Sequence, residues 1–209
     1  MVSIFLQYIP SSTKDVSRLN QPIRYWKRDC TDPVKIEAFL TATKAGFLGL
    51  SDEQQQPYVV PLNYVWYQDA IYFHGADTGR KCDIMKQNAR VCFTVSEEYG
   101  TIADPVPAST DTAYMSVMIF GHATRVTELD EATDALQAML EKYVPGYYDQ
   151  PLAKQHVAKY RSSLNSEVAV YRIDPVHISA KENPFNPERA FYPGRKVQMD
   201  VAPHGSQHE

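Results

Sequence analysis

The first clear pattern of apolar and polar positions along the chain predicts a helix. Thr31 and Asp32 stand where a side-chain oxygen can cap a helix, and Pro33 follows in the first turn, where a missing N–H costs nothing. Apolar residues then recur at helical spacing until Gly46 stops them. We therefore expect a helix running to about Lys44, with an apolar set formed by Val34, Ile36, Phe39, Leu40 and Ala42.

From Phe47 the pattern changes to short segments, rich in aromatic and β-branched residues and separated by turns, which predicts strands. The turns at 51–56 and 68–69 have hairpin lengths. Strands with a few peripheral helices indicate a mainly β fold, a small barrel with six or so antiparallel strands. The expected strands cover residues 47–50, 58–66, 70–74, 91–95, 114–126 and 167–173.

Three further features complete the expected organisation. Pro61 lies inside an apparent strand, which places it at an edge or a bulge. Helical patterns follow from Asp130 to Lys142 and, more weakly, over 152–161. The polar segment 96–113 shows no pattern of secondary structure, so we expect a long loop there, either a lid or binding loop or a floppy insertion.

Length and composition indicate one full-sized domain. The chain has 209 residues, of which 44% are hydrophobic, enough for a substantial core. We expect an N-terminal arm over 1–30, a barrel domain over 31–180 and a C-terminal extension over 181–209. A net charge of -4 gives no reason to expect nucleic-acid binding, and the basic cluster 24–28 is better explained as part of a surface arm.

Apolar runs and cysteines indicate the compartment. No apolar run approaches the roughly 20 residues that cross a bilayer, and the N-terminus lacks signal-peptide features, so we expect a cytoplasmic protein without a membrane partner. Cys30, Cys82 and Cys92 show no metal-ligand spacing, and we interpret them as small core side chains. His204 and His208 belong to a terminal tail, so we expect no metal site.

The segment 71–85 carries the most chemistry. A strand ends at His74, and Thr78 is placed to cap a helix that begins near Gly79. Helix N-termini offer unpaired N–H groups and a positive dipole end. Because Arg80 and Lys81 add two positive charges there, an anion such as phosphate would compensate them. From the residues alone, solvated helix cations remain an equal alternative.

The same segment resembles the flavin-phosphate segment of pyridoxamine 5'-phosphate oxidase-like proteins. Tyr72-Phe-His-Gly-Ala-Asp-Thr-Gly-Arg-Lys81 follows their strand, short turn and basic pair at a helix start. Pro57-Tyr-Val-Val-Pro-Leu-Asn-Tyr64 and Asn88-Ala-Arg-Val-Cys-Phe93 are similar to motifs of the nitroimidazole-resistance (Nim) branch. Order and spacing agree from about residue 46 to residue 95, and more loosely over 114–125.

The resemblance implies an FMN-binding split β-barrel that forms a homodimer with FMN between the two barrels. By position, Arg80 and Lys81 bind the phosphate, and His74 and Gly75 line the phosphate–ribityl path. The remaining cofactor-binding positions lie beside the isoalloxazine or come from the partner subunit: Pro61, Leu62, Asn63 and Tyr64 in the first group, and Ser116 in the second. His74 is also the candidate catalytic residue, binding substrate or donating a proton; the alternative is a structural hydrogen bond to the cofactor.

Two departures limit the expected activity. Where the oxidases have an Arg and a Lys that contribute to flavin binding, this chain has Val60 and Val65, and the C-terminal substrate-binding Arg-x-His pattern is absent, so vitamin B6 synthesis is not expected. We expect an FMN-dependent oxidoreductase acting on a small molecule such as a nitro-aromatic or quinone-like compound. The alternatives are a haem- or flavin-binding protein without redox turnover, and a regulatory module that uses the dimer alone.

Overall fold

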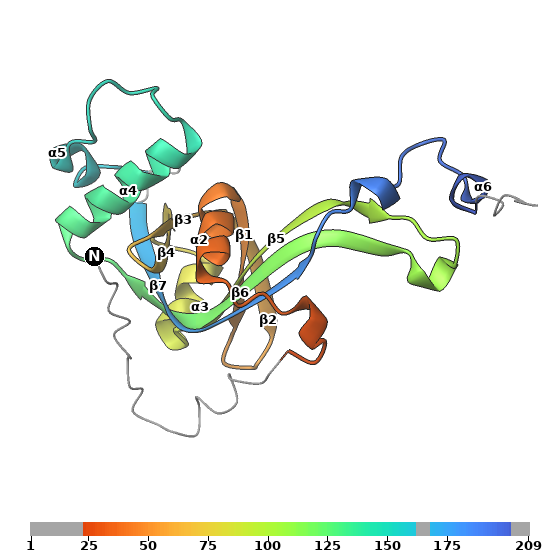
Figure 1. Ribbon diagram of the computed structural model, residues 1–209. Helices are drawn as coiled ribbons and strands as arrows, with labels where there is room; N and C mark the ends of the chain where they lie inside the picture. The colour runs from red at the N-terminus through yellow and green to blue at the C-terminus, as the bar shows by residue number, and fades with distance from the viewer. Residues whose placement is uncertain (1–22, 162–167, 202–209) are drawn as a thin grey trace, which may run out of the picture.

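A seven-stranded antiparallel sheet forms the centre of the computed structural model, which describes residues 23–161 and 168–201 (Figure 1). This confirms the mainly β expectation. Most of the predicted N-terminal arm and the tail with His204 and His208 lie outside the described residues. The strand order is β2-β1-β5-β6-β7-β4-β3. The strands are β1 Ala45–Ser51, β2 Pro57–Asn63, β3 Val65–Tyr67, β4 Ala70–Ala76, β5 Arg90–Ile102, β6 Asp111–Arg125 and β7 Val168–Asn183.

The two edges of the sheet are joined by a single residue. Sequence analysis expected one strand over 58–66, but the run is divided at Tyr64 into β2 and β3, which lie at opposite edges of the sheet. The sheet must therefore curl until its edges approach each other at Tyr64, which is the arrangement of a split barrel. Pro61 lies on the edge strand β2, as expected for a residue without an N–H.

Two apolar clusters fill the fold. The larger occupies the inside of the curled sheet and is closed by α2 (Pro33–Ala42) and α3 (Arg80–Gln87). The smaller packs α4 (Leu129–Tyr143) against the outside of β3, β4 and β7. Cys30 and Cys82 are buried and Cys92 is half-buried, which confirms their interpretation as small core side chains.

The helix predictions succeed where a local signal fixes the end. Asp32 caps α2, its Oδ1 accepting the N–H groups of Val34 at 3.0 Å and Lys35 at 3.3 Å, and α4 matches the expected 130–142 helix. The second predicted helix was wrong in length, because only α5 (Lys154–Val157) forms within 152–161. None of the helices in the described ranges has the length and hydropathy to cross a bilayer.

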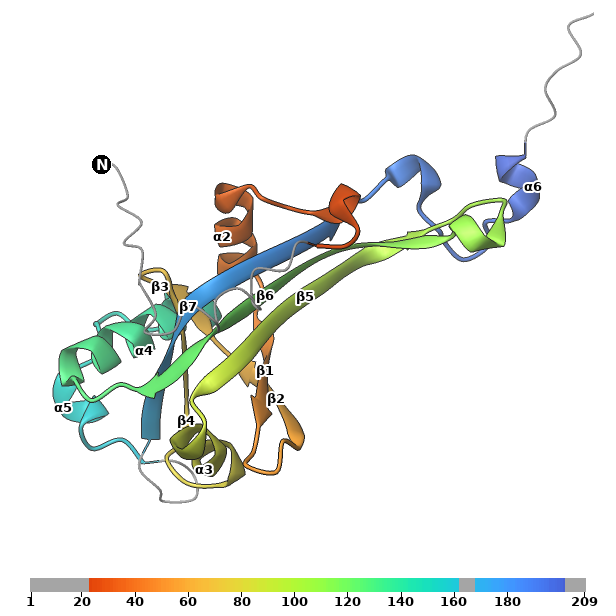
Figure 2. The ribbon, with the colours of Figure 1, turned by 90° about the horizontal axis from the view of Figure 1, so that it is seen from below.

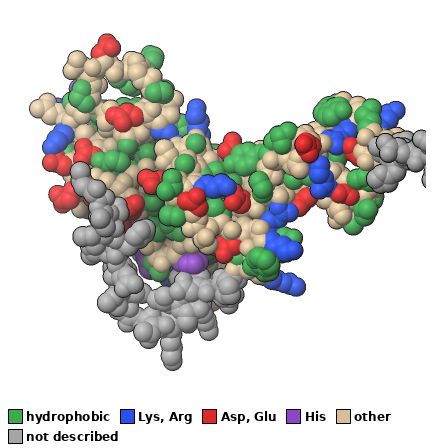
Figure 3. Space-filling model, viewed as in Figure 1, with side chains coloured by type: hydrophobic (Ala, Val, Ile, Leu, Met, Phe, Trp, Pro, Cys, Tyr) green, Lys and Arg blue, Asp and Glu red, His purple; other side chains and the backbone are tan. Residues whose placement is uncertain are grey.

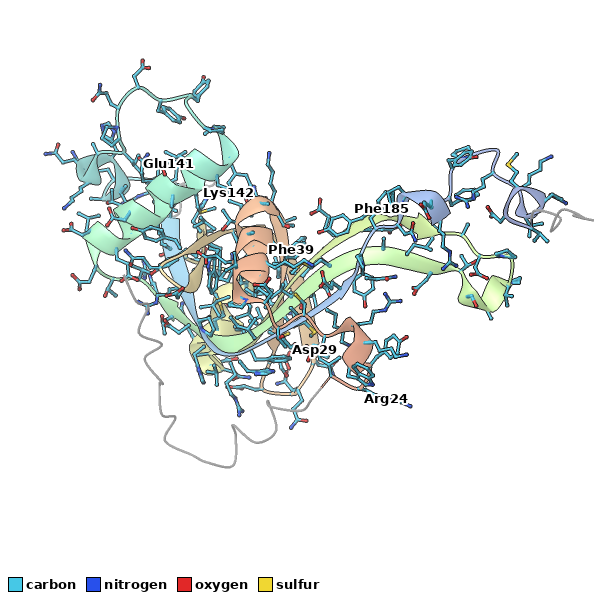
Figure 4. The ribbon with its side chains drawn as sticks, viewed as in Figure 1. Arg24, Asp29, Phe39, Glu141, Lys142 and Phe185 are labelled. Atoms are coloured by element: carbon cyan, nitrogen blue, oxygen red, sulfur yellow. The ribbon has the colours of Figure 1, made fainter. Side chains whose placement is uncertain are left out.

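Tyr143 joins the end of α4 to the place where the sheet edges meet. Its hydroxyl accepts the Tyr64 N–H at 2.9 Å and lies 3.0 Å from the Tyr64 carbonyl oxygen and close to that of Lys44. Beside it, Lys142 donates to the Leu40 carbonyl at 3.1 Å, so that α4 is tied to the end of α2 (Figure 4). These contacts hold the turn at Tyr64 in place.

Replacing Tyr143 with Phe is expected to lower the free energy of unfolding by about 2 kcal/mol, because a partly buried Tyr64 N–H loses its acceptor. Urea unfolding followed by circular dichroism measures the change. Tyr147→Phe is the matched control, since that side chain is 75% exposed and its hydroxyl has no comparable role. Equal stability of the two variants would contradict the proposed contribution of the Tyr143 hydroxyl.

The expectation of an irregular loop over 96–113 was wrong. β5 continues to Ile102 and β6 begins at Asp111, so most of this polar segment is a β-hairpin that extends away from the barrel (Figures 1 and 2). A register shift between Glu98 and Gly100 lets the pairing continue, with Gly100 at a φ of 134°. Residues 184–201, with η3 (Pro187–Arg189) and α6 (Val197–Asp200), lie beside the hairpin end. We call residues 97–112 and 184–201 together the distal lobe.

The shorter helical elements add little to the barrel. η1 (Trp26–Arg28) precedes α2 and lies beside β7, where Asp29 bridges to Lys181, and η2 (Pro107–Ser109) forms the tip of the hairpin. Ion pairs join Arg28 to Asp111, at the start of β6, and Lys35 to Glu182, near the end of β7.

Candidate functional site

The turn between β4 and α3 presents the start of a helix at the surface. Gly79, not the predicted Thr78, is the N-cap, at a φ of 104° that residues with a side chain rarely adopt. The N–H groups of Cys82 and Asp83 both donate to the Gly79 carbonyl, at 2.8 and 3.1 Å. The N–H groups of Arg80 and Lys81, in the first turn, therefore have no intrahelical acceptor and are available to a ligand.

Arg80 is held beside the edge strand β2. Its guanidinium lies 4.5 Å from the centroid of the Tyr58 ring and 3.9 Å from the Asp52 carboxylate. The side chain is nevertheless 60% exposed. Stacking and a distant carboxylate orient the guanidinium without using up its donors, which leaves its hydrogen-bonding edge open to an anion.

Lys81 reaches back over the end of β4. Its Nζ is 5.6 Å from the centroid of the Phe73 ring, and a Cβ added at Gly75 would lie only 2.7 Å from it. Among the described residues, no ion pair engages this amine. Gly75 is therefore the residue type that lets the amine lie against the strand, and within the described residues the charge of the amine has no ion-pair partner.

His74 stands near the end of β4, one residue before Gly75. Alternation along β4 puts its side chain on the opposite face from Phe73 and Gly75. The residue is exposed, yet burial, and secondly the charge of Lys81, lower the pKa of the imidazole. The lowered pKa favours the neutral imidazole at pH 7, and the exposed side chain is accessible to a ligand.

The four predicted isoalloxazine neighbours differ in what they can offer. Pro61 and Asn63 are exposed and Leu62 is half-buried on the edge strand β2. Tyr64 is fully buried: its hydroxyl donates to the Leu40 carbonyl at 2.8 Å, and its backbone N–H and C=O both contact the Tyr143 hydroxyl. The structure thus places β2 beside Arg80. The polar groups of Tyr64, however, are hydrogen-bonded within the core.

Within one chain, Ser116 lies far from the other predicted site residues. It is half-buried in the middle of β6, paired with Ser96 and Lys181. β6 reaches the β4–α3 turn at its end, where Arg125 pairs with Asp77, roughly 30 Å further along the strand. The expectation that Ser116 serves the site of a partner subunit stays a prediction.

Two residues that sequence analysis did not assign to the site contribute to it. Tyr58 carries the Arg80 guanidinium on its ring, and Asp52, in the β1–β2 turn, supplies the nearby carboxylate. Tyr58 lies within the motif 57–64, which supported the resemblance to the Nim branch. Its contact with Arg80 could not be predicted, because stacking between a strand and a later helix leaves no pattern in local spacing.

The site is open on one side. A separate hollow of about 540 Å³ lies between α2, β3 and β7, lined by Ile36, Trp66 and Ile178 among others, and includes none of the predicted site residues. The cation pair instead borders an edge strand with exposed residues. Ligand sites enclose most of their ligand, so a second wall is needed to complete this one.

Comparison with protein-family models matches residues 32–182 to the family described as pyridoxamine 5'-phosphate oxidase. The match covers the barrel, including the β4–α3 turn and the whole of the long hairpin. Comparison with curated proteins gives no significant match.

Solved structures of similar fold carry informative descriptions. A protein from Bacteroides thetaiotaomicron, whose description names 5-nitroimidazole antibiotic resistance, is 23% identical, with a TM-score of 0.57 over 73% of this chain and 85% of its own. The flavocytochrome Anf3 from Azotobacter vinelandii is 21% identical, with a TM-score of 0.66 over 82% of this chain and 78% of its own. A FAD- and haem-binding protein from Mycobacterium smegmatis is 15% identical, with a TM-score of 0.61 over 77% of each chain. At these identities the likeness establishes a shared fold.

Proposed function

Because the chain belongs to the pyridoxamine 5'-phosphate oxidase family, we propose that it is a flavoprotein that binds FMN by its phosphate at the start of α3. The observation that carries this proposal is the pair of cations at one helix start: Arg80 lies against Tyr58 of the edge strand β2, Lys81 lies over the end of β4, and two available N–H groups belong to the same turn. Its reaction is a reduction of a small molecule, such as a nitro-aromatic or quinone-like compound. The description of the Bacteroides neighbour, which names 5-nitroimidazole resistance, supports this substrate class.

The chain's own residues supply binding, orientation and electrostatics. Arg80 binds phosphate oxygens through its exposed edge while Tyr58 and Asp52 keep it in place. Lys81 adds a point charge above Gly75. Bound flavin supplies hydride or electron transfer. Neutral His74, next to this phosphate region, is placed to hold substrate or to move a proton, and we propose it as the catalytic residue.

Vitamin B6 oxidation is not part of this proposal. Val60 is half-buried and Val65 is buried, at positions where the resemblance to the oxidases calls for Arg and Lys. These apolar residues do not supply the flavin-binding charges that the oxidases carry at the two positions. The family fold is therefore used here for a different small molecule.

A second copy of the chain would supply the missing wall. The outward face of the sheet beside the site carries exposed apolar side chains at Phe47, Val59 and Met118, with 38% to 59% of their surface accessible. Thr94 lies between Phe47 and Met118 in register, and Phe120 follows Met118 on the same face of β6. We propose that two barrels pack through this face and enclose FMN between them, with Ser116 contributed by the partner subunit.

Haem in place of flavin is the competing assignment. Haem would leave Arg80 and Lys81 without a phosphate to bind, which argues against this assignment. The two haem-related neighbours are described as a flavocytochrome and as a FAD- and haem-binding protein, so neither description pairs this fold with haem alone.

The visible spectrum of the purified protein tests the proposal. We expect flavin bands near stoichiometry after addition of FMN, and reduction of the bound flavin that a nitro-aromatic acceptor reverses. A haem band without flavin would support the competing assignment. A protein that binds FMN but passes electrons to no acceptor would be a flavin carrier, which would refute the reductase part of the proposal.

Replacing Gly75 with Ala is expected to weaken FMN binding by about tenfold while the fold is kept. The new methyl group would displace only the flexible end of Lys81, so the cost falls on the position of the amine, worth about 1–2 kcal/mol as a charged contact. Fluorescence titration with FMN measures it. In a Lys81→Ala background the same change should have no effect on affinity, and an undiminished effect there would show that Gly75 acts by another route.

A further inference from the structure

The distal lobe is the most apolar exposed part of the described chain. Tyr99, Phe185, Phe191 and Tyr192 are between 43% and 54% exposed, and Val106, Val197, Met199 and Val201 between 48% and 60%. Hydrophobic side chains are visible along it in Figure 3, and Phe185 is labelled on it in Figure 4. Ile102 is its one buried hydrophobic side chain. A surface of this kind marks an interaction site.

The lobe is nevertheless held in a defined structure. The N–H of Phe191 donates to the Thr101 carbonyl and that of Ala103 to the Arg189 carbonyl, both at 2.8 Å. Arg189 pairs with Asp104, and Arg195 binds the Asp200 carboxylate together with the carbonyls of Ala190 and Glu188. These charges are paired within the lobe, and exposed Glu97, Glu98, Glu188 and Lys196 lie among its aromatic and aliphatic side chains.

The lobe continues the face through which two barrels are proposed to pack. The pairing of β5 with β1 ends at Thr94, on that face, and β5 then runs roughly 25 Å further to Ile102. A second barrel seated on the face would therefore lie alongside the lobe. Because a two-fold dimer uses each surface twice, the lobe of each chain would contact the barrel of the other.

The exposed apolar areas of the lobe and of the barrel face also favour a second copy of the chain as the binding partner. Stable dimers bury about 800 Å² on each partner. Aromatic side chains bury about 150–250 Å² each when fully covered, so the four half-exposed ones of the lobe offer roughly 400 Å². Phe47, Val59 and Met118 alone fall well short of what a stable interface needs, and the lobe supplies the missing part.

We propose that the distal lobe of each chain clamps the barrel of a second copy, with Phe191 and Tyr192 as its central contacts. The proposal rests on the dimer of the proposed function and adds the element that holds it together. Residues 184–201 of the clamp lie outside the family match, which ends at 182, whereas its hairpin residues 97–112 lie within the match.

Sedimentation velocity over a concentration series on the full chain tests the clamp. Changing Phe191 and Tyr192 together to Asp is expected to raise the dimer dissociation constant at least 100-fold, since aromatic interface residues dominate binding and symmetry counts each change twice. Tyr147→Asp with Tyr148→Asp is the matched control, with equally exposed aromatics (75% and 59%) on the loop after α4, and it should dimerise like the unmodified chain.

The outcomes separate the clamp from the dimer. An unmodified dimer that the Phe191/Tyr192 variant retains would overturn the clamp and leave the dimer standing. A monomeric unmodified chain would overturn both. Equal loss in the two variants would also refute the clamp, because the effect would then not belong to the lobe.

A photo-crosslinking residue at position 192 gives a direct readout that does not depend on weakened association. In a mixture of ¹⁵N-labelled and unlabelled chains, p-benzoylphenylalanine in place of Tyr192 should join a labelled chain to an unlabelled one. Cross-links confined to single chains would overturn the proposal. The same probe at position 147 is the control and should yield few inter-chain products.

Discussion

Changing Arg80 and Lys81 together to Ala is expected to lower the affinity for FMN by about three orders of magnitude. Each side chain contributes a charge-assisted contact worth about 1.5–3 kcal/mol, and the two act on the same phosphate. The two N–H groups at the start of α3 remain, so weak binding should persist. Fluorescence quenching of FMN on titration measures the loss.

The control variant removes the same number of positive charges, but at positions away from the site. Lys44 and Lys86 are exposed, and Lys86 lies in the last turn of the same helix. Replacing both with Ala should leave FMN affinity within about twofold of the unmodified protein, because exposed charges at a distance are screened. Both double variants should unfold at similar temperatures, since Arg80 is exposed and makes only a distant ion pair. Stoichiometric FMN retained by the Arg80/Lys81 variant would refute the phosphate assignment.

Replacing His74 with Ala is expected to leave FMN bound and to slow turnover by about 10²–10⁴-fold, the range typical of a lost proton-transfer group. The imidazole is accessible, and burial with the nearby Lys81 charge lowers its pKa, so it is neutral at pH 7 and protonates only at more acidic pH. Steady-state kinetics with a nitro-aromatic acceptor, on variant loaded to a known flavin content, gives the comparison.

A structural role for His74 predicts a different result. If the imidazole only binds the phosphate or the ribityl chain, FMN affinity and turnover should fall together, and turnover per bound flavin should be unchanged. A proton-transfer role predicts that the acid limb of the pH–rate profile disappears in His74→Ala. Partial rescue by added imidazole would support the same role.

The local part of the site could be predicted because its signals are contiguous. A strand, a turn and two cations at a helix start lie within a dozen residues, and the structure places them as expected. The cap itself differs: Thr78 has the side chain for capping, but the turn requires a positive φ, and Gly79 meets that need. Backbone conformation outweighed side-chain capping at this helix start.

What the sequence could not predict depends on long-range packing. The strand pattern around Tyr64 is continuous, and only its burial and the Tyr143 contacts show that the chain passes there from one sheet edge to the other. Likewise, Pro105 and Pro107 lie in the turn at the hairpin tip. In the sequence they indicated a loop over the whole polar segment, and the flanking strands were not predicted. Those strands are stabilised by cross-strand partners and by Arg189 and Phe191, which are more than 80 residues away in sequence.

Titration of the unmodified protein with FMN and with riboflavin, followed by flavin fluorescence, tests the central claim most directly. The two ligands share the isoalloxazine and ribityl chain and differ in the phosphate that Arg80 and Lys81 are proposed to bind. We predict that FMN binds at least 100-fold more tightly than riboflavin, and that this preference disappears in the Arg80/Lys81 variant. Equal affinity for the two ligands, or binding of neither, would contradict the account.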